Sequence, residues 1–353
     1  MTDKSSAPKR VKFVSRGNRQ RPEVWTRQLA GDSRTIDGCH FTFDPDARDY
    51  DWLIVYDDLP SVGKERFSSR TETLACPRAN TLLITGEPSS VKFYGSAFLN
   101  QFGHVLTGHE PWIITHPGAI FSQPALRWYY GVSADSVRTF DQMVGHLPSD
   151  KTRDLSTVCS SKQQKHTLHH ARYTFVQELK VHLPEMDIFG HGVRFIADKA
   201  EVLDPYRYHL AIENHVSLHH WTEKLSDSFL GLTLPFYYGC PNAADYFPRE
   251  SFISIDLYDP IGTSVIIRRA IADNEYEKRL PFIREARRRV LEQYNLFAVV
   301  SSLVNRLDTA VTAPTATRAI IRSRHQQLRV RPWLRLVLTL EKLRARRRAC
   351  NKL

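Results

Sequence analysis

The fold class is indicated by one stretch of the chain, Ala211–Gly239, which reads AIENHVSLHHWTEKLSDSFLGLTLPFYYG. An apolar run, Tyr208–Ile212, leads into it and predicts a strand, and a loop rich in His and Ser follows. An amphipathic helical pattern begins at Thr222, and Leu234–Tyr238 is again an apolar run typical of a strand. A strand, a helix and a second strand in this order are the repeating unit of a parallel sheet covered by helices.

Short apolar runs of the same kind recur along the rest of the chain. Runs of this length without polar alternation are typical of strands that are buried on both faces. We expect strands at Val11–Val14, Trp52–Tyr56, Thr81–Thr85, Trp112–Thr115, Thr157–Cys159, Asp187–Phe189, Tyr208–Ile212, Leu234–Tyr238 and Phe252–Ile255. Helical patterns lie at residues 170–183, 222–232 and 274–293. This alternation predicts an α/β fold.

The length of 353 residues predicts two domains, each large enough to bury a core. The polar stretch HLPSDKTRDLS, from His146 to Ser156, contains a proline and several charges but no periodicity, so we place the boundary there. The predicted organisation is an α/β domain at residues 1–150, a second α/β domain at residues 151–321 and a basic tail at residues 322–353.

The net charge of +11 is concentrated in that tail. Residues 322–353 contain eleven Lys and Arg and a single acid, which leaves the remaining chain with a charge of about +1. No run approaches the roughly 18 consecutive apolar residues of a membrane-spanning helix, and the polar first ten residues predict a disordered start and not a signal peptide. The five cysteines are scattered and form no CxxC pair, so we expect a protein of the reducing cytoplasm.

Polar residues collect between the strand that ends at Ile212 and the helix that begins at Thr222. In open α/β sheets nucleotides bind at the carboxyl ends of strands, and the free N–H groups of a helix start suit a diphosphate. Glu223 could then bind two ribose hydroxyls and Lys224 a phosphate. The same pattern is also that of a plain helix start, with Thr222 as the cap and Glu223 as the acid favoured in the first turn. The pattern alone leaves both interpretations open.

These residues resemble a motif of the α-1,3-fucosyltransferases, which are grouped as glycosyltransferase family 10. The family motif reads approximately F-x-(F/I)-E-N-(S/T), followed after seven residues by T-E-K-(L/I) and then by a small residue and P-(V/I)-x-x-G. The matching positions are Ala211-Ile212-Glu213-Asn214-His215, Thr222-Glu223-Lys224-Leu225, Gly231, Pro235 and Gly239, with further matches at Asp187–Gly190, Lys199, Tyr206–Tyr208 and Ser251–Asp256. The resemblance covers about residues 156–260 and implies a GT-B fold, in which two Rossmann-like domains face a cleft.

The resemblance also implies roles for individual residues. Glu223 would bind ribose or sugar hydroxyls, Lys224 the diphosphate, and Asn214 the donor. Arg172 lies where the family has a phosphate-binding arginine at the start of a helix, and the guanidinium fork suits a diphosphate. Without the resemblance, Arg172 would be interpreted as an exposed helix arginine.

Two histidines depart from the family pattern. His215 stands where Ser or Thr is usual, and His220 stands where bacterial members have a tyrosine that contacts the donor, so we include His220 among the donor-binding residues. These departures leave open a guanosine-diphosphate sugar other than fucose. His219 and His220 lack a third ligand at a suitable spacing, which favours surface or pocket residues over a metal site. The family fold needs no metal to hold the nucleotide, so we assign no metal ligand and no required cofactor, and activation by a divalent cation stays open.

A carboxylate for the acceptor side follows the predicted strand Thr81–Thr85. The segment Gly86-Glu87-Pro88 resembles the family's (T/F)-(G/E)-E-x-P, in which the glutamate is the proposed base. Inverting transfer needs a base for the acceptor hydroxyl and positive charge for the leaving diphosphate, so we predict Glu87 as the catalytic base. Chemistry alone also allows a turn acid before a proline. Asp57 and Asp58, which end another predicted strand, are either a pair of loop acids or part of the same site.

The tail has apolar residues at helical spacing, and basic residues form its polar face. The apolar positions are Trp333, Leu336, Val337, Leu340 and Leu343. Such a helix is typical of a segment that lies in an anionic membrane interface, where each basic group contributes on the order of 1 kcal/mol. A helix docked on the body and a helix that binds nucleic acid are the other interpretations. We predict that residues 330–353 bind an anionic surface at the inner face of a membrane, and we expect no nucleic acid partner.

The predicted protein is an inverting glycosyltransferase that moves fucose from GDP-fucose to a glycan hydroxyl, of α-1,3 type. The acceptor would be a bacterial surface polysaccharide or a lipopolysaccharide precursor, held by the N-terminal domain. Two alternatives stay open: a transferase for another nucleotide sugar, and a non-catalytic protein of transferase fold that binds membrane or nucleic acid through its tail. The presence of Glu87 and of the Glu223–Lys224 pair favours the enzyme.

Overall fold

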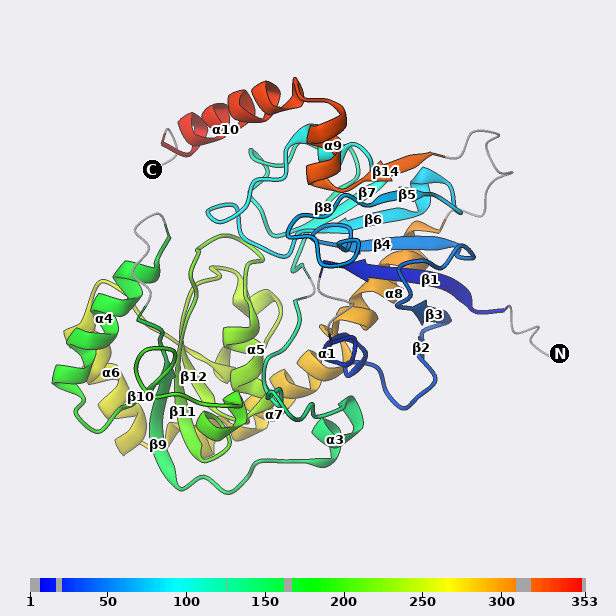
Figure 1. Ribbon diagram of the computed structural model, residues 1–353. Helices are drawn as coiled ribbons and strands as arrows, with labels where there is room; N and C mark the ends of the chain where they lie inside the picture. Colours follow the sequence, from blue (N-terminus) through cyan, green and yellow to red (C-terminus); the bar gives the residue numbers. More distant parts are fainter. Residues whose placement is uncertain (1–6, 17–20, 125, 162–166, 309–318, 351–353) are drawn as a thin grey trace. The chain divides into compact units, whose positions relative to one another are not determined.

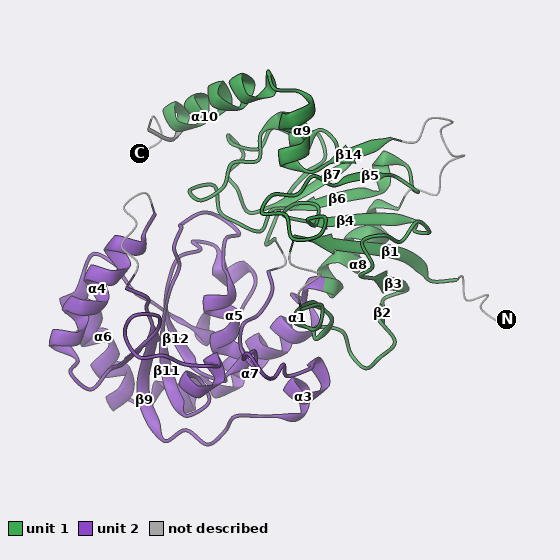
Figure 2. Cartoon of the chain, in the orientation of Figure 1, with its two compact units in different colours: residues 1–125, 297–353 green, residues 126–296 purple. Residues whose placement is uncertain are grey.

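The computed structural model describes residues 7–16, 21–124, 126–161, 167–308 and 319–350 (Figure 1). The chain forms two compact units (Figure 2). Unit 1 contains residues 1–125 and 297–353, and unit 2 contains residues 126–296.

Unit 1 is built on a seven-stranded sheet in the order β2-β3-β1-β4-β6-β7-β8. Its strands are β1 (Lys9–Ser15), β2 (Thr35–Ile36), β3 (Cys39–Thr42), β4 (Trp52–Tyr56), β6 (Thr81–Ile84), β7 (His104–Thr107) and β8 (Ala119–Phe121). All neighbours pair in parallel except β2 with β3. A separate antiparallel pair joins β5 (Thr71–Thr73) to β14 (Ile320–Arg322). The helices are α1 (Glu23–Thr26), the 3₁₀ helix Arg78–Asn80, α2 (Ser96–Leu99), α8 (Leu296–Leu307), α9 (Arg324–Val330) and α10 (Leu334–Cys350).

Unit 2 is built on a five-stranded parallel sheet in the order β10-β9-β11-β12-β13. Its strands are β9 (Arg153–Val158), β10 (Asp187–Phe189), β11 (Tyr206–Ile212), β12 (Leu234–Tyr238) and β13 (Ile253–Ser254). The helices are α3 (Phe140–Gly145), α4 (His169–His182), α5 (Glu223–Leu230), α6 (Pro260–Ala272) and α7 (Glu275–Glu292), with 3₁₀ helices at Lys199–Val202, Ala243–Asp245 and Arg249–Ser251. Helix α4 packs beside α6 and α5 beside α7, and Figure 1 shows the two pairs on opposite sides of the strands.

The predicted strands and helices are confirmed in all but one case, and β2, β3, β5, β7, β8 and β14 were not predicted. The exception is Trp112–Thr115, which is a turn followed by coil. Its apolar content reflects burial without a strand, because Ile114 is buried in the core of unit 1. Proline residues at 111 and 117 flank the segment and cannot donate to a ladder of hydrogen bonds.

The compact units divide the chain differently from the predicted domains. The first boundary lies at residues 125 and 126 and not at 150 and 151, because Trp128, Tyr130 and Met143 are buried in the core of unit 2. The chain then returns to unit 1 at Phe297, whose ring lies against those of Phe13 and Phe41, with centroids 5.4 and 4.9 Å apart. The basic tail is consequently part of unit 1.

The prediction for the start of the chain meets the structure only in part. The start was predicted to be disordered over ten residues, but Lys9 and Arg10 already belong to β1, and residues 1–6 lie outside the described residues. Among the helices described, none is both long and apolar enough to cross a membrane.

Candidate functional site

The start of α5 is held by a buried carboxylate at the end of β11. Glu213 is fully buried, and its side chain accepts hydrogen bonds from the backbone N and the Oγ1 of Thr222, at 2.8 and 2.6 Å. Thr222 is the N-cap of α5 and accepts from the backbone N of Lys224 at 3.3 Å. Gly239 makes room for this arrangement, because a Cβ there would lie 2.3 Å from Cγ of Glu213. Glu213, Thr222 and Gly239 therefore have a structural role: together they hold the start of α5 in place.

Glu223 and Lys224 form a charged pair in the first turn of α5. Nζ of Lys224 lies 2.9 Å from Oε1 of Glu223 and 3.6 Å from Oε2 of Glu213. Burial works to raise the pKa of Glu223, but Lys224 and Lys199 outweigh it and hold this pKa far below its ordinary value. Burial likewise works to lower the pKa of Lys224, but Glu223 and Glu213 outweigh it and raise this pKa. Both groups are thus charged near neutral pH, and α5 presents an acceptor and a cation together.

A cavity of about 230 Å³ opens beside this pair. Its wall is formed by the carboxyl ends of β9 and β11, the start of α4 and one face of α5. The lining residues are Val158, Ser160, His169, Arg172, Lys199, Leu203, His209, Leu210, Ala211, Ile212, Asn214, Glu223, Lys224, Asp227 and Ser228. This is the edge of a parallel sheet at which α/β proteins bind nucleotides.

Two lining residues carry buried polar atoms that find no hydrogen-bond partner among the described residues. These atoms are Nε of Arg172, a donor, and Oδ1 of Asn214, an acceptor. Leaving such atoms unpaired in a folded protein costs about 1–3 kcal/mol each. A ligand that offers an anionic oxygen to Arg172 and an N–H or O–H group to Asn214 would remove that cost.

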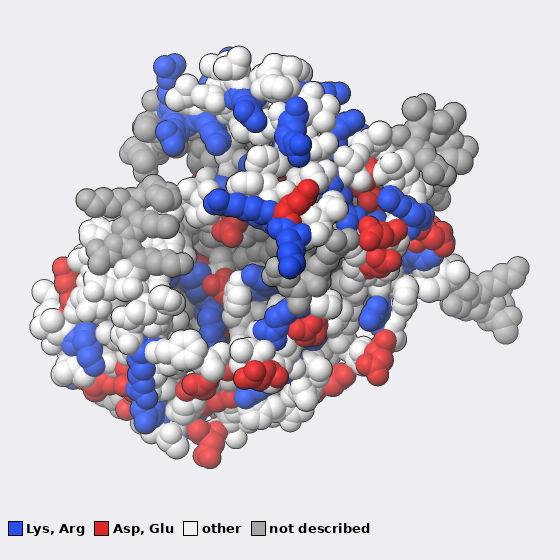
Figure 3. Space-filling view, viewed as in Figure 1, with Lys and Arg blue, Asp and Glu red and all other residues white. Residues whose placement is uncertain are grey.

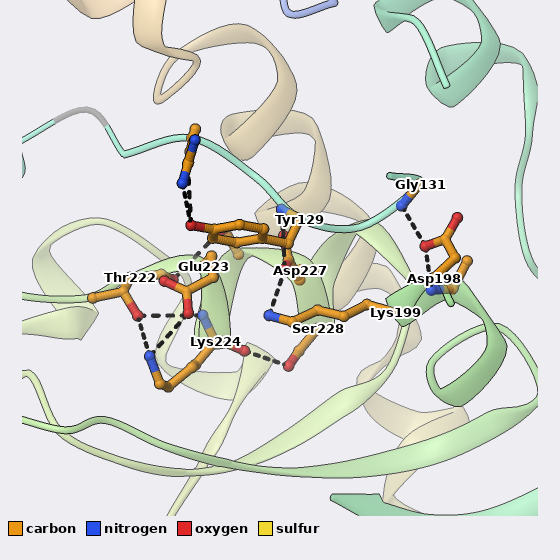
Figure 4. A network of polar contacts seen from close by, with 12 residues as sticks. Tyr129, Gly131, Asp198, Lys199, Thr222, Glu223, Lys224, Asp227 and Ser228 are labelled. Carbon is orange, nitrogen blue, oxygen red and sulfur yellow. Dashed lines mark hydrogen bonds and ion pairs between the residues drawn. The ribbon is translucent and has the colours of Figure 1, made fainter. Parts of the chain in front are cut away.

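A second charged pair lies deeper along α5 and was not predicted. Lys199 reaches Oδ2 of Asp227 at 2.8 Å, and the backbone N of Tyr129 donates to Oδ1 of Asp227 at 3.1 Å (Figure 4). Burial raises the pKa of Asp227, which Lys199 opposes. Burial and the charge of Lys199 lower the pKa of His209 to about 3, so this ring is neutral. Asp227 is four positions after Glu223, and this helical spacing was the signal that could have revealed it.

The cavity brings together four of the five residues predicted to bind the donor: Arg172, Asn214, Glu223 and Lys224. His220 is buried, and its ring meets that of His215 edge to face with centroids 5.3 Å apart. Within the described part of the chain, His220 is not among the residues that line the cavity.

The neighbouring His219 holds the loop that carries His220. Its backbone has a φ of 65°, its N–H donates to Oδ1 of Asn242 at 2.7 Å, and its Nδ1 lies 2.6 Å from Oη of Tyr246. Over the described residues, no group of three His, Cys, Asp or Glu side chains is arranged to hold a metal ion.

Glu87, the predicted base, belongs to unit 1. It is exposed in the turn that follows β6. Asp57 and Asp58 directly follow the neighbouring strand β4, which pairs with β6 in parallel. Asp57 accepts from Nζ of Lys92 at 2.6 Å. Asp58 accepts from the backbone N of Leu59 and of Arg324, at 2.8 and 3.2 Å.

Comparison with known proteins assigns unit 2. Residues 148–275 match the model of a family described as glycosyltransferase family 10 (fucosyltransferase), C-terminal part. This part of unit 2 is therefore similar to glycosyltransferase family 10. This confirms the resemblance seen in the sequence, and the matched range contains all four cavity residues named above.

Two further proteins are similar to this chain. A curated α-(1,3)-fucosyltransferase from Helicobacter pylori is 33% identical over 66 residues, which are 19% of this chain and 13% of that relative. A crystal structure of an α1,3-fucosyltransferase with GDP-fucose aligns with a TM-score of 0.50 at 14% identity, over 88% of this chain and 94% of that one. The structural likeness confirms the GT-B fold, with two Rossmann-like units.

Proposed function

We propose that the protein transfers fucose, with inversion, from GDP-fucose to a hydroxyl of a glycan, in an α-1,3 type of linkage. The observation that carries this proposal is the cavity of unit 2. There Arg172 and Asn214 have unpaired polar atoms beside the Glu223–Lys224 pair. The choice of GDP-fucose as the donor is supported by the similar α1,3-fucosyltransferase, whose crystal structure was solved with GDP-fucose.

In the proposed reaction, the acceptor oxygen attacks the anomeric carbon of fucose while the bond to the diphosphate breaks. The carboxylate of Glu87 takes the proton of the acceptor hydroxyl, and the bonding electrons leave with GDP. Arg172 and Lys224 offset the charge that grows on the leaving diphosphate. Because these cations belong to the protein, we propose that donor binding requires no metal cofactor, and the effect of divalent cations on the rate stays to be measured.

Calorimetric titration with GDP, UDP and CDP tests the nucleotide. We expect GDP to bind most tightly, and tighter binding of UDP would refute the assignment. A panel of nucleotide sugars then tests the donor, with nucleotide release as the signal. Release from GDP-fucose above other GDP sugars is expected, whereas preference for another GDP sugar would keep the reaction class and replace the sugar.

We also propose that the protein works at the inner face of a bacterial membrane on a surface polysaccharide or lipopolysaccharide precursor. Helix α10 and the turn before it support this, because Trp333 of the turn and Leu336, Leu340 and Leu343 of the helix are exposed. Lys342 and several arginines flank these apolar residues, and Figure 3 shows basic side chains gathered over this helix. Apolar residues flanked by cations suit an anionic lipid surface.

A further inference from the structure

The turn that carries Glu87 is held by two buried side chains. The backbone N–H of Gly86 donates to Oη of Tyr94 at 3.1 Å, and Nε2 of His109 donates to the carbonyl oxygen of Glu87 at 2.7 Å. The two rings are only 2% and 3% exposed and lie next to each other, with centroids 5.6 Å apart. The backbone on both sides of the Glu87 Cα is therefore fixed from inside the unit, while the carboxylate itself is at the surface.

The hydroxyl of Tyr94 is in turn fixed by Asp57. It donates to Oδ1 of Asp57 at 2.5 Å, and Nζ of Lys92 donates to the same oxygen at 2.6 Å. Burial and the neighbouring carboxylate raise the pKa of Tyr94 well above its ordinary value, so the phenol keeps its proton and stays a donor. The hydroxyl thus accepts from Gly86 and donates to Asp57, which leaves it little freedom to rotate.

The backbone at this place is unusual in two ways. Asp57 has a φ of 70°, a left-handed conformation that only glycine adopts freely and that Asp and Asn tolerate better than other residues. A Cβ at Gly86 would lie 2.9 Å from Cε1 of Tyr56, so the turn passes directly over that ring. Residues held in strained conformations are concentrated at functional sites, where the surrounding structure must enforce them.

The segment that carries Tyr94 is fixed by a distant part of the chain. Nη2 of Arg324, in the first turn of α9, donates to the carbonyl oxygen of Phe93 at 2.7 Å. The guanidinium of Arg324 also lies 5.3 Å from the centre of the Tyr94 ring. Gln327 of the same helix donates to the carbonyl oxygen of Ala97 at 2.7 Å. Helix α9, near the C-terminal end of the chain, therefore helps to fix the position of Tyr94.

We propose that Tyr94, oriented by Asp57, is a positioning residue that sets the geometry of Glu87 for proton transfer. This inference rests on the proposed function, in which Glu87 is the base. It assigns Asp57 to support and not to proton transfer, because both Lys92 and Tyr94 already donate to one of its oxygens. A catalytic group must be held within about 0.5 Å of its productive place, so loss of the Tyr94 hydroxyl should reduce the rate without touching donor binding.

The first test is Tyr94→Phe in the full chain. Hydrogen exchange at the Gly86 amide should become faster, and this readout does not depend on any activity. The kcat of GDP release from GDP-fucose should fall at least about tenfold, while KM for GDP-fucose and the GDP dissociation constant stay within about twofold. Tyr258→Phe, at an exposed tyrosine of unit 2, is the matched control and should change neither quantity.

The second test compares Asp57→Asn with Asp57→Gly. Asn tolerates the left-handed backbone and keeps an oxygen that accepts from Tyr94, whereas Gly keeps only the backbone freedom. We expect Asp57→Asn to retain most of the transfer rate and Asp57→Gly to behave like Tyr94→Phe.

Three possible results distinguish failure of the positioning role of Tyr94 from failure of the proposed function. Unchanged exchange at Gly86 together with an unchanged kcat in Tyr94→Phe would overturn the positioning role. A loss in Asp57→Asn as large as that in Glu87→Gln would make Asp57 the base and overturn it as well. If the parent protein turns over no GDP-fucose, the proposed function fails, while the exchange measurement still decides whether Tyr94 holds the turn.

Discussion

At the scale of single residues, the cavity in unit 2 combines fixed charges with polar atoms that have no partner in the described part of the chain. Lys224 is paired with Glu223, whereas Nε of Arg172 and Oδ1 of Asn214 are unpaired. Burying a polar atom without a hydrogen bond is costly, so these two atoms at the cavity wall are available to a ligand. These atoms therefore carry more information about the ligand than the satisfied Lys224–Glu223 pair.

Lys224→Ala and Arg172→Ala should each weaken GDP binding. A hydrogen bond to a charged group contributes about 1.5–3 kcal/mol, so the dissociation constant should rise roughly tenfold to hundredfold in calorimetric titration. Lys224→Ala should also lower Tm, because Glu213 then remains buried without its neighbouring cation. Lys278→Ala, an exposed position on α7, is the control. Parent-like GDP binding in both variants would show that the phosphates bind elsewhere.

Glu87→Gln tests the base. The change keeps the shape of the side chain and removes its basicity, so transfer should slow by about 10²–10⁴-fold. The affinity for GDP should stay at the parent value, because Arg172 and Lys224 line a cavity of unit 2, whereas Glu87 belongs to unit 1. A variant that transfers fucose within a few-fold of the parent rate would mean that another group removes the proton.

Asp58 should make stability depend on pH. Burial raises its pKa to about 6, above the ordinary value of 3.8, although hydrogen bonds from Arg324 and Leu59 oppose the shift. The folded protein then holds this proton more tightly than the unfolded chain, so its stabilising contribution is present at low pH and is lost as pH rises through about 6. Asp58→Asn is always neutral, and its Tm relative to the parent should be higher at about pH 7.5 than at about pH 5. An equal difference at both pH values would contradict this.

At the scale of elements, the connection from β11 to α5 explains why the donor motif has its spacing. Glu213, directly after β11, accepts hydrogen bonds from the helix cap Thr222, and Gly239, directly after β12, leaves room for the side chain of Glu213. The motif therefore mixes two kinds of residue. Asn214 and Lys224 line the cavity, whereas Glu213 and Gly239 hold the walls in place.

Gly239→Ala should disturb this connection. The added methyl group would meet Glu213 at 2.3 Å, and overpacking of this kind costs about 1–3 kcal/mol. We expect a Tm several degrees lower and weaker GDP binding, since Thr222 and the start of α5 must move with Glu213. Gly145→Ala, where the new Cβ meets nothing within 4 Å, is the matched control and should be close to neutral. Parent-like Tm and GDP affinity in Gly239→Ala would show that the contact relaxes freely.

At the scale of the whole molecule, one side of the C-terminal segment packs against unit 1 and the other side is exposed. Leu334 is 5% exposed, and Val337, Leu338 and Glu341 face a small cavity of unit 1 beside α2. The carboxylate of Glu341 accepts from the backbone N of Ser96 at 3.1 Å. Val337 was expected to share the apolar face of Trp333 and Leu336, which are 59% and 71% exposed, and instead lies on the docked side.

The exposed side of α10 can be tested without undocking the helix. Trp333→Ser, Leu336→Ser and Leu340→Ser together remove three of the four exposed apolar residues named above and leave Leu334 and Glu341 in place. Each buried apolar side chain contributes about 1.5–3 kcal/mol to such an association, so binding to phosphatidylglycerol vesicles should fall more than tenfold.

Two controls define the outcome of the vesicle experiment. Val181→Ser removes an exposed apolar residue from α4 of unit 2 and should leave vesicle binding unchanged. Vesicles of phosphatidylcholine should bind the parent more weakly, because they carry no net charge. Unchanged binding of the triple variant would refute the membrane role, and binding of the parent to nucleic acid but not to vesicles would replace it.

The sequence by itself determined the parallel α/β character, most of the strands and the part of the candidate site that lies between Glu213 and Lys224. These features are local, because a buried strand is a short apolar run and a helix start has a cap and an acid within a few residues. Arg172 was found through a family resemblance, and its place in the cavity agrees with that prediction.

Tertiary structure alone decided the rest. Lys199 and Asp227 meet across 28 positions of sequence, and Arg324 meets Phe93 across 231. The same holds for the return of residues 297–353 to unit 1 and for the two faces of α10. Such contacts depend on which surfaces are buried against each other once the sheets have formed. Hydrophobic burial is non-directional, so the sequence of one segment carries no periodic pattern that identifies the distant segment it packs against.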